Sequence, residues 1–148
     1  MTETAEDLFI TYRGVVYPWQ CDQMGHMNVA HYVGKFDEAT WQMFAAIGVT
    51  PAYMHERQCG VAAVQQNISY RRELRAGDLL TIRTAILEMS PKKIRFYHEM
   101  YNDQSGALSA TTVIIGVHMD IQSRRACPFP DEIVERAAQM ILPITPVI

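Results

Sequence analysis

The sequence lacks several patterns that would assign it to a specialised class of protein. Its cysteines, Cys21, Cys59 and Cys127, are odd in number and have no C-x-x-C spacing, so they predict neither a disulfide framework nor a zinc site. No apolar run approaches the ~18 residues that a membrane span needs. The acidic start, MTETAED, has no apolar segment of the kind found in signal peptides. These absences favour a cytoplasmic protein that does not associate with a membrane.

Positive charge is also scarce, because 13 Lys and Arg residues stand against 16 Asp and Glu residues, giving a net charge of −3. Such a surface is not attracted as a whole to phosphate, so a nucleic-acid partner is not expected. The basic residues gather between Arg71 and Arg95, where seven of them stand against three acidic residues. The sequence therefore predicts a local basic surface on an otherwise acidic protein.

No internal repeat, low-complexity tract or linker divides the 148 residues. This length suits one domain with a real core, and 49% hydrophobic with 20% charged residues is typical of a soluble globular domain. We therefore expect a single domain over residues 1–148.

Hydrophobic periodicity predicts one long helix near the N-terminus. A strand over residues 9–17, rich in β-branched and aromatic side chains, stops at Pro18. The period then changes to that of a helix over 28–47, with Asn28 as N-cap and Gly48 after the last turn. One stripe of this helix is apolar and a second is polar. The apolar stripe contains Tyr32, Phe36, Met43, Phe44 and Ile47, and the polar stripe contains His31, Lys35, Glu38 and Gln42.

The rest of the chain predicts strands. After an irregular stretch over 51–60, strands are expected over 61–74, 79–88, 94–101 and 108–120, followed by a helix over 130–140. Tight turns between the four strands predict hairpins and hence an antiparallel arrangement. The long helix must bury its apolar stripe against that sheet, which gives a two-layer α+β domain. A sheet edge left open would invite pairing with a second subunit.

The segment from Cys21 to Tyr32, CDQMGHMNVAHY, is the most informative about chemistry. It places a carboxylate (Asp22) and an imidazole (His26) on a loop that leads directly into a helix. The first amide groups of a helix have no intrahelical partner and can stabilise an oxyanion that develops on a carbonyl. A carboxylate on the other side of that carbonyl could attack its carbon or deprotonate a water molecule that does.

This segment resembles the hotdog-fold acyl-CoA thioesterases of the 4-hydroxybenzoyl-CoA type, whose signature is D-x-x-G followed by an x-N-x-x-Y helix start. The part GHMNVAHY is also similar to the D-x-x-x-H-x-N motif of acyl-ACP thioesterases. The resemblance covers nearly the whole chain. It implies a five-stranded antiparallel sheet wrapped around one long helix, with a C-terminal helix added. It also implies hydrolysis of an acyl-CoA to a carboxylic acid and free CoA, without a metal or a bound cofactor.

By the same resemblance, Asp22 is the catalytic nucleophile or general base. Backbone amides near Val29 would form the oxyanion hole. Asn28 and His26 match the polar pair that binds or orients the acyl carbonyl or the water. His26 stands directly after Gly25, where other members have an aliphatic residue, and this departure leaves the detailed mechanism open.

Family members often carry a further carboxylate just past the position of Tyr32, where both Asp37 and Glu38 stand. The family forms homodimers, and often homotetramers, with the active site at the subunit interface. Tyr32 and the strand over 61–70 would line the substrate pocket, and residues 53–59 could form a lid.

Two further groups of residues are candidates for substrate binding. Gly25 would let the backbone approach the substrate closely. The phosphates of CoA are strongly anionic and call for basic side chains at strand ends or turns. The candidates for this role are Arg71, Arg72, Lys92 and Lys93.

Ordinary structural roles remain open for most of these residues. Asp22 would be a turn residue, Asn28 a plain N-cap, His26 a loop residue that bonds backbone, and Asp37 and Glu38 solvated helix residues. A nucleophilic role for Cys21 lacks a base that the motif does not already employ. His98 and His118 lie in strand patterns without Cys or His partners at ligand spacing, so no metal site is expected.

Two other functions compete with thioester hydrolysis. A hotdog-fold enoyl-CoA hydratase or dehydratase would usually carry a D-x-x-x-x-H motif, whereas Asp22 and His26 are spaced one residue closer. A non-catalytic acyl-CoA-binding regulator of this fold would carry an added DNA-binding segment. Only about eight residues precede the first expected strand, so such a segment is not expected.

Overall fold

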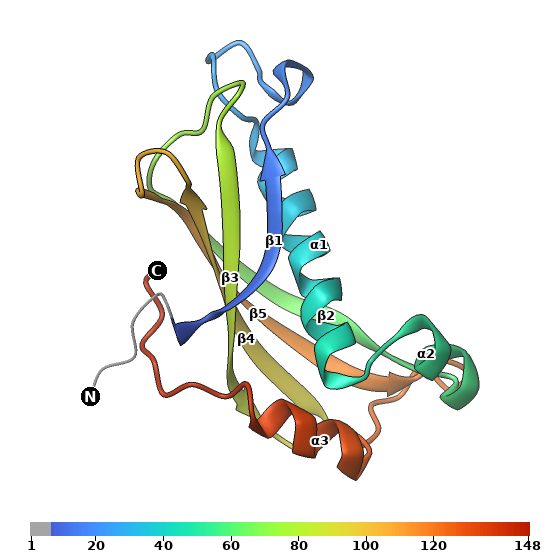
Figure 1. Ribbon diagram of the computed structural model, residues 1–148. Helices are drawn as coiled ribbons and strands as arrows, with labels where there is room; N and C mark the ends of the chain where they lie inside the picture. Colours follow the sequence, from blue (N-terminus) through green and yellow to red (C-terminus); the bar gives the residue numbers. More distant parts are fainter. Residues whose placement is uncertain (1–6) are drawn as a thin grey trace.

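The computed structural model describes residues 7–148, in which a curved sheet wraps around a long helix (Figure 1). The acidic residues 1–6, part of the segment that argues against a signal peptide, lie outside the described residues. The loop before the long helix lies at one end of the sheet, and the two shorter helices lie at the other (Figure 1). The elements in chain order are β1 (Phe9–Val15), the short 3-10 helix η2 (Pro18–Gln20), α1 (Val29–Ile47), α2 (Pro51–Arg57), β2 (Cys59–Tyr70), β3 (Leu79–Met89), β4 (Lys93–Asn102), β5 (Leu108–Asp120) and α3 (Asp131–Ala138).

The sheet has five strands in the order β1-β3-β4-β5-β2, and every neighbouring pair is antiparallel. The predicted α+β class is therefore confirmed, as are the hairpins that join β3, β4 and β5. The predicted hairpin between β2 and β3 is wrong. β2 ends at Tyr70 and pairs with β5, so it forms one edge of the sheet. Residues 71–78 then carry the chain across the sheet to β3. Leu74 is fully buried on this path, and its carbonyl accepts the Met27 amide at 2.7 Å.

Helix α1 forms as the periodicity predicts. Its N-cap Asn28 accepts the Ala30 amide at 3.0 Å, and Gly48 after its last turn has a φ of 97°, which favours glycine. All residues of the apolar stripe are buried between the helix and the sheet. The predicted polar stripe is interrupted, however, because Lys35 is only 5% exposed. β1 covers it, and its ammonium donates to the Val15 carbonyl at 3.3 Å and lies 5.5 Å from the Tyr12 ring centre.

The stretch after α1, expected to be irregular, contains helix α2. Thr50 caps this helix by accepting the Tyr53 amide at 3.1 Å, and Pro51 occupies the first helical turn, where its missing N–H costs nothing. Tyr53 is 9% exposed and its hydroxyl lies 2.7 Å from Nε2 of His118. The suggestion of a lid over 53–59 is therefore not supported, since its first residue is fixed in the core.

The centre of the sheet contains a buried histidine. Nδ1 of His98 lies 2.6 Å from the Thr84 hydroxyl and Nε2 lies 2.8 Å from the Thr40 hydroxyl on α1. Burial lowers the pKa of His98 to about 3, so its imidazole is neutral at physiological pH. This polar chain fixes the position of α1 over the sheet.

The C-terminal segment that follows α3 pairs with β3 at Ile86 and then runs over part of the outer face of the sheet. The Leu142 amide donates to the Ile86 carbonyl at 3.0 Å, and the Val147 amide donates to the Tyr97 hydroxyl at 3.1 Å. Tyr97 is consequently buried, although it alternates with the inward-facing residues of β4.

None of the helices in residues 7–148 combines the length and apolar character needed to cross a membrane.

Candidate active site

The loop between η2 and α1 is a tight turn that presents the Asp22 side chain. The Gly25 amide donates to the Asp22 carbonyl at 3.0 Å, and the Asp22 amide donates to the His26 carbonyl at 3.2 Å. Gly25 has a φ of 83°, a conformation that L-residues with a side chain rarely adopt. Glycine at this position therefore serves the turn that aims the carboxylate.

Both oxygens of the Asp22 carboxylate accept hydrogen bonds. Oδ2 accepts from the Asn28 side-chain amide at 2.8 Å, and Oδ1 accepts from the Met24 backbone amide at 2.9 Å. The bond from Asn28, followed by the bond from Met24, holds the pKa of Asp22 below its ordinary value. Asp22 is therefore an anion at neutral pH, which is the form needed to attack a carbon atom or to accept a proton.

Asn28 joins the carboxylate to the helix. Its Oδ1 caps α1 through the Ala30 amide, while its Nδ2 donates to Asp22, so the predicted N-cap role is confirmed and a second contact accompanies it. The Val29 amide occupies the first helical position, for which an α-helix provides no acceptor of its own. The Asp22 carboxylate is thus held close to the N-terminus of α1, which is the positive end of the helix dipole.

A pocket of about 800 Å³ opens beside this helix start. It brings together predicted residues from two parts of the chain: His26, Val29 and Tyr32 from the site loop and α1, and Arg71 and Arg72 from the segment after β2. The remaining lining residues are Met27, Tyr70, Glu73, Arg75, Asp78, Asn102, Ser105, Ala107 and Ser109. The rings of Tyr32 and Tyr70, which both line the pocket, pack edge to face with centres 5.2 Å apart.

The other candidates lie apart from this pocket within one subunit. The Asp22 side chain does not line it and stands partly exposed beside the helix start. Asp37 and Glu38 lie on the exposed surface of α1, in two different grooves.

Lys92 and Lys93 lie at the opposite end of the sheet from the pocket. β4 is ten residues long and runs from Lys93 to Asn102, which lines the pocket. At about 3.3 Å per residue this strand spans about 30 Å. In a single subunit, the two lysines therefore do not join Arg71 and Arg72.

Among the pocket residues that sequence reasoning did not single out, two have distinctive contacts. Ser109 is fully buried, its hydroxyl has no hydrogen-bond partner in residues 7–148, and its carbonyl accepts the amides of Arg71 and Arg72 at 2.8 and 3.1 Å. Glu73 places a carboxylate oxygen 3.9 Å from Nε2 of His26. Ser109 lies in a nearly continuous apolar strand and Glu73 in a basic segment, so neither stands out in the sequence.

Two known proteins of similar sequence carry the names of thioesterases. The betainyl-CoA thioesterase of Pseudomonas aeruginosa is 25% identical over 126 residues, which cover 85% of this chain and 79% of that protein. The long-chain acyl-CoA thioesterase FadM of Escherichia coli is 25% identical over 123 residues, which cover 83% of this chain and 92% of that protein.

Solved structures of similar shape show the same fold. A Staphylococcus aureus protein in complex with CoA superposes with a TM-score of 0.86 at 19% identity, covering 98% of this chain and 90% of that one. A 1,4-dihydroxy-2-naphthoyl-CoA thioesterase from Synechocystis gives a TM-score of 0.78 at 17% identity, covering 88% and 96%. The family model described as the thioesterase-like superfamily matches residues 16–137. These findings confirm the predicted hotdog fold and the predicted enzyme class, a thioester hydrolase: the chain belongs to the thioesterase-like superfamily.

Proposed function

We propose that the protein hydrolyses an acyl-CoA to a carboxylic acid and free CoA, with Asp22 as the catalytic carboxylate. The observation that carries this proposal is the pairing of an ionised Asp22 with the first amides of α1, joined through Asn28. Relatives over most of the chain carry the names of acyl-CoA thioesterases, which supports the choice of substrate class.

Two chemical routes start from this arrangement. In the nucleophilic route, an Asp22 oxygen bonds to the thioester carbon and the carbon–sulfur bond breaks. The CoA thiolate leaves and takes up a proton, and water then hydrolyses the resulting anhydride. In the general-base route, Asp22 takes a proton from the water molecule that attacks the carbon; the carbon–sulfur bond then breaks, and the CoA thiolate leaves and takes up that proton. The lowered pKa of Asp22 keeps the carboxylate ionised at neutral pH, which is the form that both routes require.

In both routes, negative charge develops on the carbonyl oxygen in the transition state. The Val29 amide, at the first position of α1, would donate to this oxygen, and the helix dipole would add to the stabilisation. Arg71 and Arg72 would hold the phosphates of CoA, because they line the same pocket as Val29 and are anchored through their backbone amides.

The active enzyme is, in this proposal, a homodimer or a larger homo-oligomer. β2 is twelve residues long and forms an edge of the sheet, with β5 as its only strand neighbour among the described residues. A long edge strand of this kind is a template for pairing with another chain. A second subunit across β2 would enclose the partly exposed Asp22 and complete the pocket.

The test of this function compares Asp22→Ala with Asp120→Ala. Asp120 is a matched control, since its Oδ1 also accepts a backbone amide in a turn, that of Ser123 at 2.8 Å, and its pKa is also lowered. Turnover of a panel of acyl-CoAs should fall by roughly 10²–10⁴ in Asp22→Ala and stay near the wild-type rate in Asp120→Ala. Circular dichroism would verify that both variants fold.

Two results would remove the claim: no thioester turned over by the wild-type protein, or full activity in Asp22→Ala. Hydration of an enoyl-CoA in place of thiol release would point to the hydratase alternative. Rapid quenching followed by mass spectrometry separates the two routes, because only the nucleophilic route leaves an acyl group on Asp22.

A further inference from the structure

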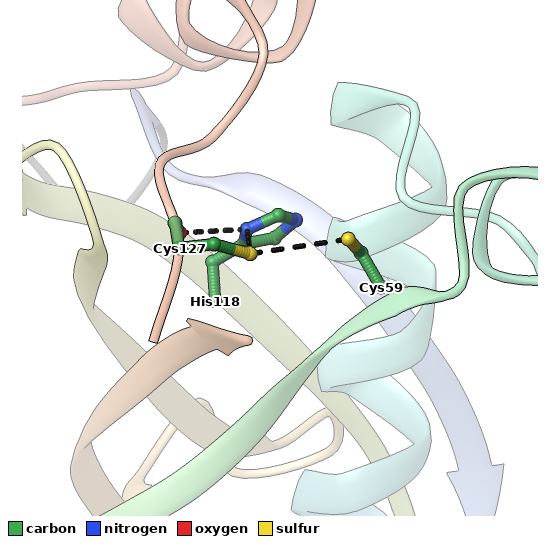
Figure 2. Close-up of side chains that lie close together, drawn as sticks. All are labelled: Cys59, His118 and Cys127. Carbon is green, nitrogen blue, oxygen red and sulfur yellow. Dashed lines mark hydrogen bonds between the residues drawn. The ribbon is translucent and has the colours of Figure 1, made fainter. Parts of the chain in front are cut away.

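Three potential metal ligands meet at the end of the sheet that lies away from the Asp22 loop. Cys59, His118 and Cys127 each direct one ligand atom into a common space, with all three atoms within 4.8 Å of one another (Figure 2). The two sulfur atoms are 3.9 Å apart, and the Cys127 sulfur is 3.4 Å from Nδ1 of His118. His118 is buried and the cysteines are half-buried, so the group lies just below the surface.

The sheet itself brings these residues together. β5 contributes His118, β2 contributes Cys59 from one side, and the segment before α3 contributes Cys127 from the other side. The Cys127 amide donates to the His118 carbonyl at 2.9 Å, so these two residues are direct cross-strand neighbours. Cys59 is paired with Asp120, two residues after His118, and therefore projects from the same face of the sheet.

Two of the three distances within the group are close to those of a zinc site. A tetrahedral zinc ion with Zn–S bonds of about 2.3 Å and a Zn–N bond of about 2.05 Å requires edges of about 3.8 Å between sulfurs and about 3.6 Å between sulfur and nitrogen. Two edges are close to these values, with 3.9 Å between the sulfurs and 3.4 Å between the Cys127 sulfur and Nδ1 of His118. The third edge, between the Cys59 sulfur and the imidazole, is at most 4.8 Å. In a disulfide the two sulfurs would instead be bonded at about 2.05 Å.

We propose that Cys59, Cys127 and Nδ1 of His118 form a binding site for a thiophilic metal ion, with Zn²⁺ as the expected ion. Two thiolates and one imidazole are ligands that zinc prefers, and three protein ligands leave the fourth tetrahedral position for water. The ion would tie the start of β2, the end of β5 and the segment leading to α3 to one another.

Tyr53 completes the surroundings of the imidazole. Without metal, Nδ1 of His118 lies 2.9 Å from the Cys127 carbonyl and Nε2 lies 2.7 Å from the Tyr53 hydroxyl. A metal on Nδ1 would replace the contact of this nitrogen with the Cys127 carbonyl, so the imidazole and that carbonyl would shift apart. The ring proton would move to Nε2 and be donated to the Tyr53 oxygen, whose own hydrogen would turn away; such a contact is the usual outer partner of a metal-bound histidine. The imidazole thus keeps one proton and the two thiols each release one, so binding releases two protons.

Zinc titration of the reduced, chelator-treated full chain tests the proposal. Isothermal calorimetry in buffers of different ionisation enthalpy should give one Zn²⁺ per chain and a release of two protons. Co²⁺ in place of Zn²⁺ should produce sulfur-to-metal charge-transfer absorption and the intense visible bands of tetrahedral Co²⁺. Absence of a one-to-one complex, or cobalt binding without these bands, would contradict the site.

Variants separate this site from other metal-binding groups. Cys59→Ser and Cys127→Ser should each weaken Zn²⁺ binding by more than about 100-fold, since loss of an outer contact alone costs 10–100-fold. Tyr53→Phe, which keeps all three ligands and the ring, should weaken binding by about tenfold. Cys21→Ser is the matched control, because Cys21 is the one cysteine outside the group.

Unchanged affinity in Cys59→Ser and Cys127→Ser, or an equal loss in Cys21→Ser, would overturn the assignment. None of these readouts depends on the thioesterase activity, so this proposal and the proposed function can fail separately.

Discussion

At the scale of single residues, Asn28 connects the chemistry of Asp22 to the stability of α1. Its two side-chain ends have different partners: Oδ1 accepts the Ala30 amide of the helix, and Nδ2 donates to the Asp22 carboxylate. A substitution can therefore keep one contact and remove the other.

Asn28→Asp is expected to preserve the helix cap and impair catalysis. Aspartate caps helices as well as asparagine does, but it places a second carboxylate where a donor stood 2.8 Å from Asp22. The like charge raises the pKa of Asp22, so the acidic limb of the kcat/KM profile should move to higher pH. The loss of a hydrogen bond to a charged group should lower kcat/KM roughly 10- to 100-fold at neutral pH.

Asn28→Ser serves as the control for this substitution, since it keeps a capping oxygen and adds no charge. Its rate should fall with a much smaller shift of the acidic limb. A profile for Asn28→Asp that coincides with the wild-type profile would show that Asn28 does not act on Asp22.

The buried His98 predicts acid sensitivity. Its pKa is about 3 in the folded protein and about 6.5 in the unfolded chain. Below pH 6.5 the unfolded state binds a proton that the folded state does not bind, so the free energy of unfolding falls as pH falls. By linkage this costs about 2 kcal/mol at pH 5 relative to pH 7.5. Urea unfolding at the two pH values measures the loss.

His98→Gln should reduce this pH dependence, while His31→Gln, at a less buried histidine, should retain it. Nuclear magnetic resonance gives an independent check, because the His98 ring signals should not titrate between pH 5 and 8. A His98 titration midpoint near 6.5 would contradict the prediction.

At the scale of elements, the end of β2 decides which basic residues reach the pocket. β2 stops at Tyr70, and the amides of Arg71 and Arg72 then both donate to the Ser109 carbonyl. The backbone of this segment is therefore fixed by β5 and not by the arginine side chains. Removing those side chains should change ligand binding without moving the segment.

Arg71→Ala and Arg72→Ala are each expected to raise KM for an acyl-CoA about tenfold or more. This is the loss of affinity expected when one hydrogen bond to a charged group is removed. A thioester of pantetheine, which lacks the nucleotide phosphates, should show little change. The double variant Lys92→Ala/Lys93→Ala tests the other basic pair. An effect of the lysines larger than that of the arginines would place the phosphates at the opposite end of the subunit.

At the scale of the whole molecule, one subunit does not enclose the proposed site. Asp22 lies outside the pocket that His26 and Val29 line, and β2 leaves an edge of the sheet open. Val64, at an irregularity of this strand, is 61% exposed. A charged side chain on such an edge opposes pairing between strands.

Val64→Lys is therefore expected to shift the protein toward the monomer and to lower its activity together with its oligomeric state. Light scattering coupled to size exclusion measures the first and thiol release the second. Val134→Lys on α3 is the control, since that valine is also exposed, at 39%, but lies away from β2. A wild-type protein that is a fully active monomer would refute the proposed assembly.

The features that the sequence determined by itself rest on contacts between residues close in the chain. Backbone geometry within a few residues decides the helix cap at Asn28, the end of α1 at Gly48 and the turn at Gly25. The residue types that favour each of these conformations can therefore be recognised in the sequence. The same signals were present at Thr50 and Pro51 for α2, and the sequence interpretation overlooked them. The range of β5 also followed from its pattern alone.

Only the tertiary structure decided which distant residues meet. Strand order placed Arg71 and Arg72 beside the site loop and Lys92 and Lys93 about 30 Å away, although all four lie within one basic segment of the sequence. The packing of β1 over α1 buried Lys35 in a stripe of polar residues. The pairing of β5 with its neighbours brought together Cys59, His118 and Cys127, whose spacing in the chain gives no ligand pattern.

The physical reason for this division is that a cap or a turn is selected by local backbone conformation, whereas sheet pairing depends on the free energy of the whole core.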